Sequence, residues 1–234
     1  DLSFPHTHGD DSDIRIAYCP ERILPGKVIS ELIDNDRVIG GMTKSCSDAA
    51  IEVYKVFVKG NCMSTDTRTA EMIKLTENAS RDVNIALANE LSIICDELGI
   101  DVWEMINLAN NHPRVIILQP GPGVGGHCIA VDPWFIVSED PENSKIIKTA
   151  RDINDAKPYW VIDKIKAKAD LLGTNKVACF GLAFKPDIDD LRETPAMKIV
   201  EKFKKDGYEF IVSEPNISTH SDFKIKTYEA VSYT

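Results

Sequence analysis

One cysteine stands at the end of a loop built largely of glycine and proline. The loop covers residues 119–128, Gln-Pro-Gly-Pro-Gly-Val-Gly-Gly-His-Cys, and its last residue is Cys128. Glycines such as Gly125 and Gly126 let a backbone approach a ligand closely and leave N–H groups free to bind an oxyanion. A thiol at the end of such a loop is well placed for nucleophilic attack. The pattern therefore predicts that Cys128 is a catalytic nucleophile.

Two other features of this loop suggest different roles, a dinucleotide-binding turn and a catalytic base. Residues 121–126 satisfy the letter of the dinucleotide motif G-x-G-x-x-G, which needs a strand before it and a helix after it. Prolines interleave with the glycines, and Asp132-Pro133 is expected to interrupt any following helix, so the loop is better explained as a cradle for Cys128. His127 is a tempting base, but adjacent side chains usually point in different directions. A structural role for His127 is therefore favoured.

A lysine and an asparagine lie one helical turn apart earlier in the chain. Lys74 and Asn78 are spaced i, i+4 and share one face of a predicted helix. A cation and an amide aimed together could stabilise a developing negative charge. The alternative is a solvated lysine beside an asparagine that makes a local hydrogen bond.

A long helix over residues 69–98 is expected to carry this pair. Its apolar residues recur at the three-to-four spacing of a helix: Met72, Ile73, Leu75, Ala79, Val83, Ala86, Leu87, Leu91 and Ile94. Gly99 is a predicted C-cap. Asp101 with Glu104 resembles a capping box that opens the next helix, which ends by Pro113.

Strand and helix patterns flank this central region on both sides. On the N-terminal side we expect strands at 14–18, 37–41 and 61–66 and a helix at 46–59. On the C-terminal side we expect a helix from 144 to 171, broken or kinked at Pro158, then a turn, strands at 177–180 and 208–212, and a helix at 194–206. The fold class is α/β, with parallel βαβ units at both ends of the chain.

Composition excludes several classes of protein. The 234 residues carry a net charge of −10, which disfavours nucleic acid and anionic membranes as partners. No apolar run reaches the roughly 18 residues of a membrane span, and the N-terminus lacks the pattern of a secretory signal. The six cysteines are scattered without a Cys-x-x-Cys pair, so neither a metal site nor a disulfide framework is expected. Reduced thiols fit a cytoplasmic protein.

Four segments in one order resemble the UDP-glucose/GDP-mannose dehydrogenase family. They are residues 19–26 (CPERILPG), 69–78 (TAEMIKLTEN), 123–133 (GVGGHCIAVDP) and 181–193 (GLAFKPDIDDLRE). The resemblance covers nearly the whole chain, and four motifs in order are far more specific than any one of them.

The resemblance implies a three-part organisation. Residues 1–66 would be the remnant of an N-terminal Rossmann-like NAD-binding domain, 67–172 a central long-helix domain with catalytic and dimerisation roles, and 173–234 the start of a C-terminal α/β UDP-binding domain. The chain would begin inside the first domain, without the pyrophosphate-binding turn for NAD, and stop inside the third. We therefore expect no turnover from the 234 residues alone. A homodimer built on the long helix is implied.

The family oxidises the C6 alcohol of a nucleotide sugar to a carboxylate in two steps, with two NAD+ consumed. The resemblance implies that Cys128 forms a thiohemiacetal and then a thioester, which water cleaves. Lys74 and Asn78 would stabilise the oxyanion. Asp132 would organise the water or transfer a proton, and Glu21 would serve as general base.

Further residues would bind the substrate and the cofactor by the same resemblance. Arg22, Lys185 and the backbone of Gly125 and Gly126 would contact the UDP-sugar. Arg114 would reach the sugar nucleotide of a neighbouring subunit, and Arg192 would contact NAD. A few converging cations of this kind allow an acidic chain to hold a diphosphate.

The identity of the sugar is inferred from the forms of two of these motifs. Arg22 and Pro25 depart from the pattern of UDP-glucose enzymes, and the forms of the first and third motifs resemble those of members that act on UDP-N-acetyl-D-mannosamine. Nucleotide sugars of N-acetylgalactosamine, N-acetylglucosamine or glucose remain as alternatives. A catalytically silent nucleotide-sugar binding protein is a third hypothesis, disfavoured by the presence together of Lys74, Asn78, Cys128 and Asp132.

Overall fold

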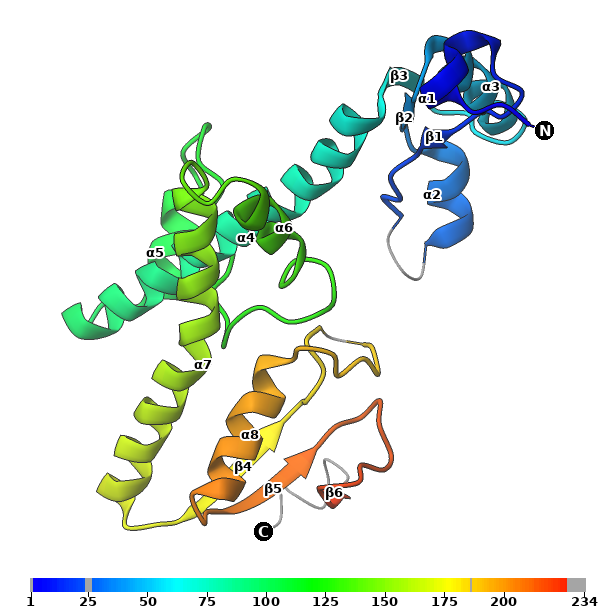
Figure 1. Cartoon of the computed structure of the whole chain (residues 1–234). Coiled ribbons are helices and arrows are strands. Elements are labelled where there is room, and N and C mark those ends of the chain that lie inside the picture. Colours follow the sequence, from blue (N-terminus) through cyan, green and yellow to red (C-terminus); the bar gives the residue numbers. More distant parts are fainter. Residues whose placement is uncertain (1, 24–26, 186, 227–234) are drawn as a thin grey trace. The chain divides into compact units, whose positions relative to one another are not determined.

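A computed structural model describes residues 2–23, 27–185 and 187–226 (Figure 1). The chain forms two compact units, which divide between Glu77 and Asn78. Residues 24–26 of the first family-like segment, with the departure at Pro25, and residues 227–234 of the last expected domain lie outside the described ranges.

The first unit holds a three-stranded sheet in the order β1-β2-β3. Its elements are α1 (Pro5–His8), a 3-10 turn η1 (Gly9–Asp11), β1 (Ala17–Tyr18), α2 (Val28–Asp34), β2 (Arg37–Gly41), α3 (Lys44–Tyr54) and β3 (Cys62–Asp66). β2 and β3 are parallel and joined through α3, whereas β1 is antiparallel to β2. The predicted βαβ unit is confirmed, but only two residues of the strand expected at 14–18 pair in the sheet.

Two adjacent glycines end β2 because nothing larger fits there. A Cβ on Gly40 would lie 2.5 Å from the Asp66 carbonyl oxygen and 2.6 Å from the Ala70 Cβ. A Cβ on Gly41 would lie 2.4 Å from the backbone nitrogen of Ser47. The pair therefore brings the end of β2 against the first turn of α3 and the start of the next helix.

The long helix expected at 69–98 is confirmed as α4 (Thr67–Leu98). Asp66 caps its first turn, accepting 3.0 Å and 2.6 Å hydrogen bonds from the backbone N–H and hydroxyl of Thr69. At the other end Gly99 has a positive φ of 68°, and the Ile100 N–H donates to the Cys95 carbonyl, as in a Schellman cap. The C-terminal end is thus the one that the sequence predicts through Gly99, whereas the start, set by Asp66, lies two residues before the predicted one.

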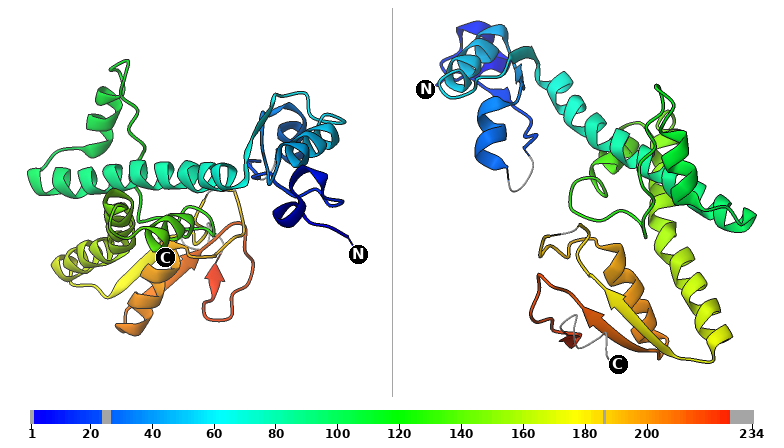
Figure 2. Two further views of the ribbon diagram at one scale, coloured as in Figure 1. Left: turned by 45° about the horizontal axis from the view of Figure 1, so that its top comes forward. Right: turned by 180° about the vertical axis from the view of Figure 1, so that it is seen from behind.

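The second unit joins helices to a parallel sheet in the order β4-β5-β6 (Figure 2). Its elements after α4 are α5 (Val102–Ala109), α6 (Asp132–Glu139), α7 (Lys145–Leu172), β4 (Lys176–Phe180), α8 (Pro195–Lys205), β5 (Glu209–Ser213) and β6 (Ile225–Lys226). Asp101 caps α5 as predicted, accepting from the N–H groups of Trp103 and Glu104. The β4-α8-β5 unit is parallel, as the sequence predicts.

One prediction about proline is wrong and another is decided in part. α7 continues through Pro158, which is buried in its interior, so the helix is not broken there, and the kink stays a prediction. Asp132-Pro133 does not prevent a helix but opens one, because Pro133 occupies the second position of α6. A backbone N–H in the first helical turn has no partner within the helix, so proline loses little there.

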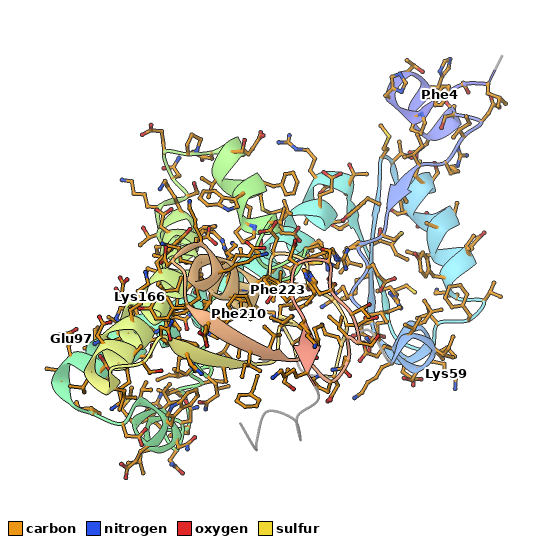
Figure 3. All side chains as sticks on the ribbon, turned by 90° about the horizontal axis from the view of Figure 1, so that it is seen from below. Phe4, Lys59, Glu97, Lys166, Phe210 and Phe223 are labelled. Atoms are coloured by element: carbon orange, nitrogen blue, oxygen red, sulfur yellow. The ribbon has the colours of Figure 1, made fainter. Side chains whose placement is uncertain are left out.

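The core of the second unit lies between its sheet and its two C-terminal helices. Leu182, Val200 and Val212 are almost fully buried there, and α8 packs against both α7 and β5. Phe210 and Phe223 meet edge to face with ring centroids 5.6 Å apart, and both are labelled in Figure 3. Among the described helices none combines the length and apolar character needed to cross a membrane.

Candidate active site

Cys128 begins the turn that leads into α6. Its carbonyl accepts hydrogen bonds from the N–H groups of Val131 at 3.0 Å and Asp132 at 2.8 Å. The thiol-bearing residue is half-buried, and it is a free cysteine. A residue held by its own backbone at a helix start, and still reachable from solvent, is suited to carry a nucleophile.

Asn78 and Asp132 are brought together from distant parts of the chain. Nδ2 of Asn78, on α4, donates a 2.6 Å hydrogen bond to Oδ2 of Asp132, the first residue of α6. Asn78 is buried, and the carboxylate is favoured at a helix N-terminus. Three of the predicted catalytic residues, Cys128, Asn78 and Asp132, are therefore connected through consecutive hydrogen bonds.

The glycines of the loop allow it to dock closely on the segment after β4. The Gly126 N–H donates a 2.9 Å hydrogen bond to the Arg192 carbonyl. A Cβ on Gly126 would lie 2.9 Å from the ring of Phe184, and one on Gly125 would lie 2.6 Å from the Phe184 Cβ and 2.9 Å from the Glu193 carbonyl oxygen. Gly126 and Glu193 both have a positive φ, of 85° and 52°. Because Glu193 has a side chain, its conformation is a local strain beside the loop.

An ion pair lies beside the cysteine loop. Arg192 donates from Nε and Nη2 to both carboxylate oxygens of Asp190, at 2.6 to 3.0 Å. These hydrogen bonds lower the pKa of Asp190 to about 2, and His127 adds a smaller lowering effect. The same pairing raises the pKa of Arg192, with a minor contribution from the charge of Cys128. The ion pair therefore belongs to the electrostatic surroundings of the loop that carries His127 and Cys128.

The remaining predicted residues of the second unit are exposed. Lys185 follows Phe184 directly, so the docking of Phe184 on Gly126 brings Lys185 to the neighbourhood of the loop. Arg114 lies in the connection after α5, and within the described ranges its guanidinium makes no hydrogen bond or ion pair. His127 is exposed as well.

The first unit holds a separate group around Glu21. Its Oε1 accepts from the backbone N–H groups of Arg22 at 2.7 Å and Ile23 at 2.8 Å, and from the guanidinium of Arg37 at 3.3 Å. The Lys74 ammonium donates to the Glu21 carbonyl at 2.8 Å. The predicted residues Glu21 and Lys74 are therefore in contact.

Arg22 makes a different contact within this unit. Its Nη2 lies 2.8 Å from Oε1 of Glu77 on α4, and both side chains are about one third exposed. An ion pair of this exposure contributes little stability by itself. It holds the guanidinium near α4 and leaves it open to solvent.

Two residues of these groups were not identified from the sequence. Arg37 is a charged residue at the start of the buried strand β2 and is only 3% exposed. It pairs with Glu21. Phe184 packs on Gly126. An arginine within a strand that is otherwise apolar was the available signal for Arg37. Phe184 stood inside a recognised motif, but as an apolar residue it suggested core packing.

The side chains present are suited to anions and less to metals. Among the described residues no group of three His, Cys, Asp or Glu side chains is arranged to hold a metal ion. Arg192 is 62% exposed at the side chain, and Lys185 and Arg114 are also exposed. Guanidinium and ammonium groups of this kind fit the phosphates of a dinucleotide or a sugar nucleotide.

Three domain models of one family match the chain in sequence order. They are the NAD binding domain over residues 4–58, the central domain over 68–156 and the UDP binding domain over 178–233 of the UDP-glucose/GDP-mannose dehydrogenase family. The predicted catalytic residues all fall within these ranges: Glu21 in the first, and Lys74, Asn78, Cys128 and Asp132 in the second.

Relatives of high sequence identity are named for two different sugars. A UDP-N-acetyl-D-mannosamine dehydrogenase of Campylobacter jejuni is 65% identical over 219 residues, 93% of this chain and 54% of that protein. An NDP-N-acetyl-D-galactosaminuronic acid dehydrogenase of Ralstonia nicotianae is 62% identical over 93% of this chain and 52% of that protein. The solved UDP-N-acetyl-mannosamine dehydrogenase from S. aureus is 50% identical with a TM-score of 0.78, covering 92% of this chain and 50% of that one. The chain spans about half the length of the relatives it matches.

Proposed function

Because the chain belongs to the UDP-glucose/GDP-mannose dehydrogenase family, we propose that it forms part of an NAD-dependent nucleotide-sugar 6-dehydrogenase. The reaction is the two-step oxidation of a C6 alcohol to a carboxylate. The observation that carries the proposal is the connected set of Asn78, Asp132 and Cys128 in the matched central domain. NAD+, when bound, accepts one hydride in each of the two oxidations.

Cys128 is the covalent catalyst in this proposal. The first oxidation gives an aldehyde at C6, and the Cys128 sulfur adds to its carbonyl carbon to form a thiohemiacetal. Loss of the second hydride gives a thioester on Cys128. Water then attacks the thioester carbon, releasing the carboxylate and returning the free thiol. The half-buried position of Cys128 supports this role, because the intermediate must be held without being sealed from water.

The other proposed catalytic residues have complementary roles. Asn78 and Lys74 stabilise the oxyanion of the thiohemiacetal and of the tetrahedral intermediate of hydrolysis. Asp132 orients water or moves its proton, and the amide of Asn78 fixes its carboxylate. Glu21 is the general base for hydrolysis, held by Arg37 and by neighbouring N–H groups.

Exposed cations and glycines bind the two nucleotides. Arg22 and Lys185 take the UDP-sugar, with the backbone of Gly125 against the sugar. Gly126, whose N–H is bonded to the Arg192 carbonyl, holds that stretch of loop in place. Arg114 extends to the sugar nucleotide held by a neighbouring subunit. Arg192 is suited to hold the anionic dinucleotide, since its guanidinium is exposed and its backbone carbonyl is bonded to the cysteine loop at Gly126. Binding, rather than chemistry, is the contribution of these four cations.

We divide the chain into three functional parts. Residues 1–66 contribute to NAD binding, 67–172 to catalysis and dimerisation, and 173–234 to UDP binding. The family matches at 4–58, 68–156 and 178–233 support this division.

The substrate we propose is UDP-N-acetyl-D-mannosamine, and the product its uronate, as used in polysaccharide synthesis. The mannosamine enzymes of Campylobacter jejuni and S. aureus support this choice. The N-acetylgalactosamine nucleotide is the second candidate, since the Ralstonia relative is nearly as similar, at 62% identity. Both sugars carry an acetamido group, which glucose lacks.

A homodimer in the cytoplasm completes the proposal. Three apolar side chains of α4, Leu87, Ile94 and Leu98, are 46%, 46% and 67% exposed and are spaced by seven and four residues, which puts them on one face. A second copy would cover such a face. Sedimentation should give a dimer for the parent and a monomer for Leu98→Asp. The free state of all six cysteines supports a reducing compartment.

The decisive experiment follows NADH release by the protein that contains this chain. UDP-N-acetylmannosamine, UDP-N-acetylgalactosamine, UDP-N-acetylglucosamine and UDP-glucose are compared in the parent, in Cys128→Ser and in Cys62→Ser as a matched control. We expect two NADH per N-acetylmannosamine nucleotide in the parent and the control, and no uronate from Cys128→Ser. Full turnover in Cys128→Ser would refute the covalent mechanism. Binding of a UDP-sugar without NADH release from any sugar would favour a silent binding protein.

A further inference from the structure

A network of buried polar side chains connects α4 to α7 beneath the cysteine loop. Asp82 and Asn89 on α4 are 0% exposed, and Arg151 and Asn154 on α7 are 1% exposed. Four polar side chains this deeply buried between two helices are costly unless they are fully hydrogen-bonded.

Direct hydrogen bonds link all four of these side chains. Arg151 donates to Oδ1 of Asp82 at 2.6 Å, and Asn154 donates to the same oxygen at 2.8 Å and to the Asp82 carbonyl at 3.0 Å. Asn89 then donates from Nδ2 to Oδ1 of Asn154 at 2.8 Å. The orientation of the Asn89 amide is therefore fixed, with its oxygen directed away from Asn154.

That oxygen binds the entrance of the cysteine loop. The Gly121 N–H donates a 2.8 Å hydrogen bond to Oδ1 of Asn89. Two residues later the loop touches α7, where a Cβ on Gly123 would lie 3.1 Å from the Pro158 ring and 3.2 Å from the Asn154 carbonyl oxygen. Pro158 has no N–H to give that carbonyl, so the helix is locally open on the side where the loop lies.

The network is better explained by the position that it gives to the loop than by a contribution to the stability of the fold. A buried arrangement of charges and amides is often no more stabilising than apolar side chains of the same volume, but it enforces one geometry. Here the fixed geometry places one acceptor, Oδ1 of Asn89, at the backbone N–H of Gly121. Because Gly121 lies between Pro120 and Pro122, which have no N–H, this bond is the backbone anchor available to that stretch of loop.

We propose that Asn89, oriented by Asn154 and Asp82, is a positioning residue for Cys128. It acts by fixing the entrance of the loop through Gly121, while the Gly126–Arg192 hydrogen bond fixes the other side. Asn89 itself does not touch the reacting atoms. This inference rests on the proposed role of Cys128 as nucleophile.

Amide hydrogen exchange in the whole chain tests the anchor without requiring turnover. Asn89→Ala removes the acceptor, and Gly121→Pro removes the donor without altering the helices. Each has a matched control. Ser92→Ala removes two other buried hydrogen bonds of the same region, one accepted from Lys157 and one donated to the Asn89 carbonyl, and leaves the Asn89 side chain in place. Gly121→Ala keeps the loop N–H, and its Cβ would meet the Gly123 carbonyl oxygen only at 3.9 Å.

Loss of one hydrogen bond of about 1 kcal/mol should raise exchange in the loop about fivefold. We expect that rise over residues 123–128 in Asn89→Ala and in Gly121→Pro, with a similar rise in the rate at which iodoacetamide alkylates Cys128. Ser92→Ala and Gly121→Ala should stay within about twofold of the parent. If Asn89→Ala fails to fold, the two Gly121 variants decide the question alone.

Equal loop exchange in Asn89→Ala and Ser92→Ala, or no change in Gly121→Pro, would overturn the proposal. Turnover separates it from the proposed function. If Cys128→Ser still forms uronate, the nucleophile is wrong even where loop exchange responds as expected. If Cys128→Ser is inactive and loop exchange does not respond, the nucleophile stands and the positioning role of Asn89 falls.

Discussion

Asn78 and Asp132 are 54 residues apart in the sequence and are joined by a 2.6 Å hydrogen bond between Nδ2 and Oδ2. The bond uses one of the two N–H groups of the amide, which leaves the other free to donate to a developing oxyanion. It also fixes the carboxylate that begins α6, directly after the turn from Cys128. In the proposed mechanism, the Asn78 side chain would therefore stabilise the charge on the substrate and also orient the Asp132 carboxylate.

Replacing Asn78 by alanine should lower activity much more than stability. Removal of an oxyanion donor typically reduces kcat by about 100- to 1000-fold, and release of Asp132 would add to this loss. The measurement is the steady-state rate of NADH formation together with the melting temperature. Asn84→Ala is the matched control, since among the described residues the hydrogen bond of its amide goes to the Ser80 carbonyl of its own helix. Equal rates in the two variants would contradict the role of Asn78.

Gly126→Ala should destabilise the chain through a close contact and an unfavourable φ. The new Cβ would lie 2.9 Å from the Phe184 ring at a φ of 85°, and we expect a loss of about 1–3 kcal/mol, seen as a lower melting temperature. Phe184→Ala should restore part of the stability of Gly126→Ala. It should restore less in Gly125→Ala, whose Cβ also meets the Glu193 carbonyl oxygen at 2.9 Å. Identical rescue of both variants would argue against this packing.

Local signals were enough to predict the elements that carry the site. The helix ends at Gly99 and at Asp101 follow from capping residues, and the cysteine loop follows from its glycines and prolines. Lys74, Asn78, Cys128 and Asp132 were identified because each belongs to a short motif.

Contacts between distant segments could not be predicted in this way. The bond from Gly121 to Asn89 spans 32 residues and that from Arg37 to Glu21 spans 16 residues. Each depends on how helices and strands pack, and neither residue type signals its partner. The error at Asp132-Pro133 has a different cause, since proline was taken as a helix breaker at a position where it is a good helix starter.

Thiol labelling should distinguish Cys128 from Cys179 of β4, a second half-buried cysteine. Burial raises the pKa of Cys179 to about 11, so at pH 8 only about one thousandth of it is thiolate. Cys128 is a half-buried residue at the end of an open loop. We expect iodoacetamide to alkylate Cys128 at least about tenfold faster than Cys179 in the native chain, followed by peptide mass spectrometry. Labelling of Cys179 first would show that the loop protects Cys128 more than its exposure suggests.

Lys157 should make stability depend on pH in the alkaline range. Burial lowers the pKa of this α7 lysine to about 8, against about 10.4 in an unfolded chain. Between these values the unfolded state binds more protons than the folded state, so the free energy of unfolding should rise from pH 8 to about pH 10. Below pH 8 the folded chain bears the full cost of a buried ammonium, which lies 3.9 Å from the centre of the Trp160 ring.

Urea midpoints at pH 7, 8, 9 and 10 measure this effect as the difference in stability between the parent and Lys157→Met. The difference is needed because thiols and phenols also titrate in this pH range. Lys157→Met should lose the rise, and its stability relative to the parent should be most favourable at pH 7, where the parent carries the buried charge. Lys168→Met, on an exposed position of the same helix, should keep the rise of the parent. Parallel curves for the parent and Lys157→Met would mean that water or a shift of α7 solvates the ammonium, and that burial does not govern its titration.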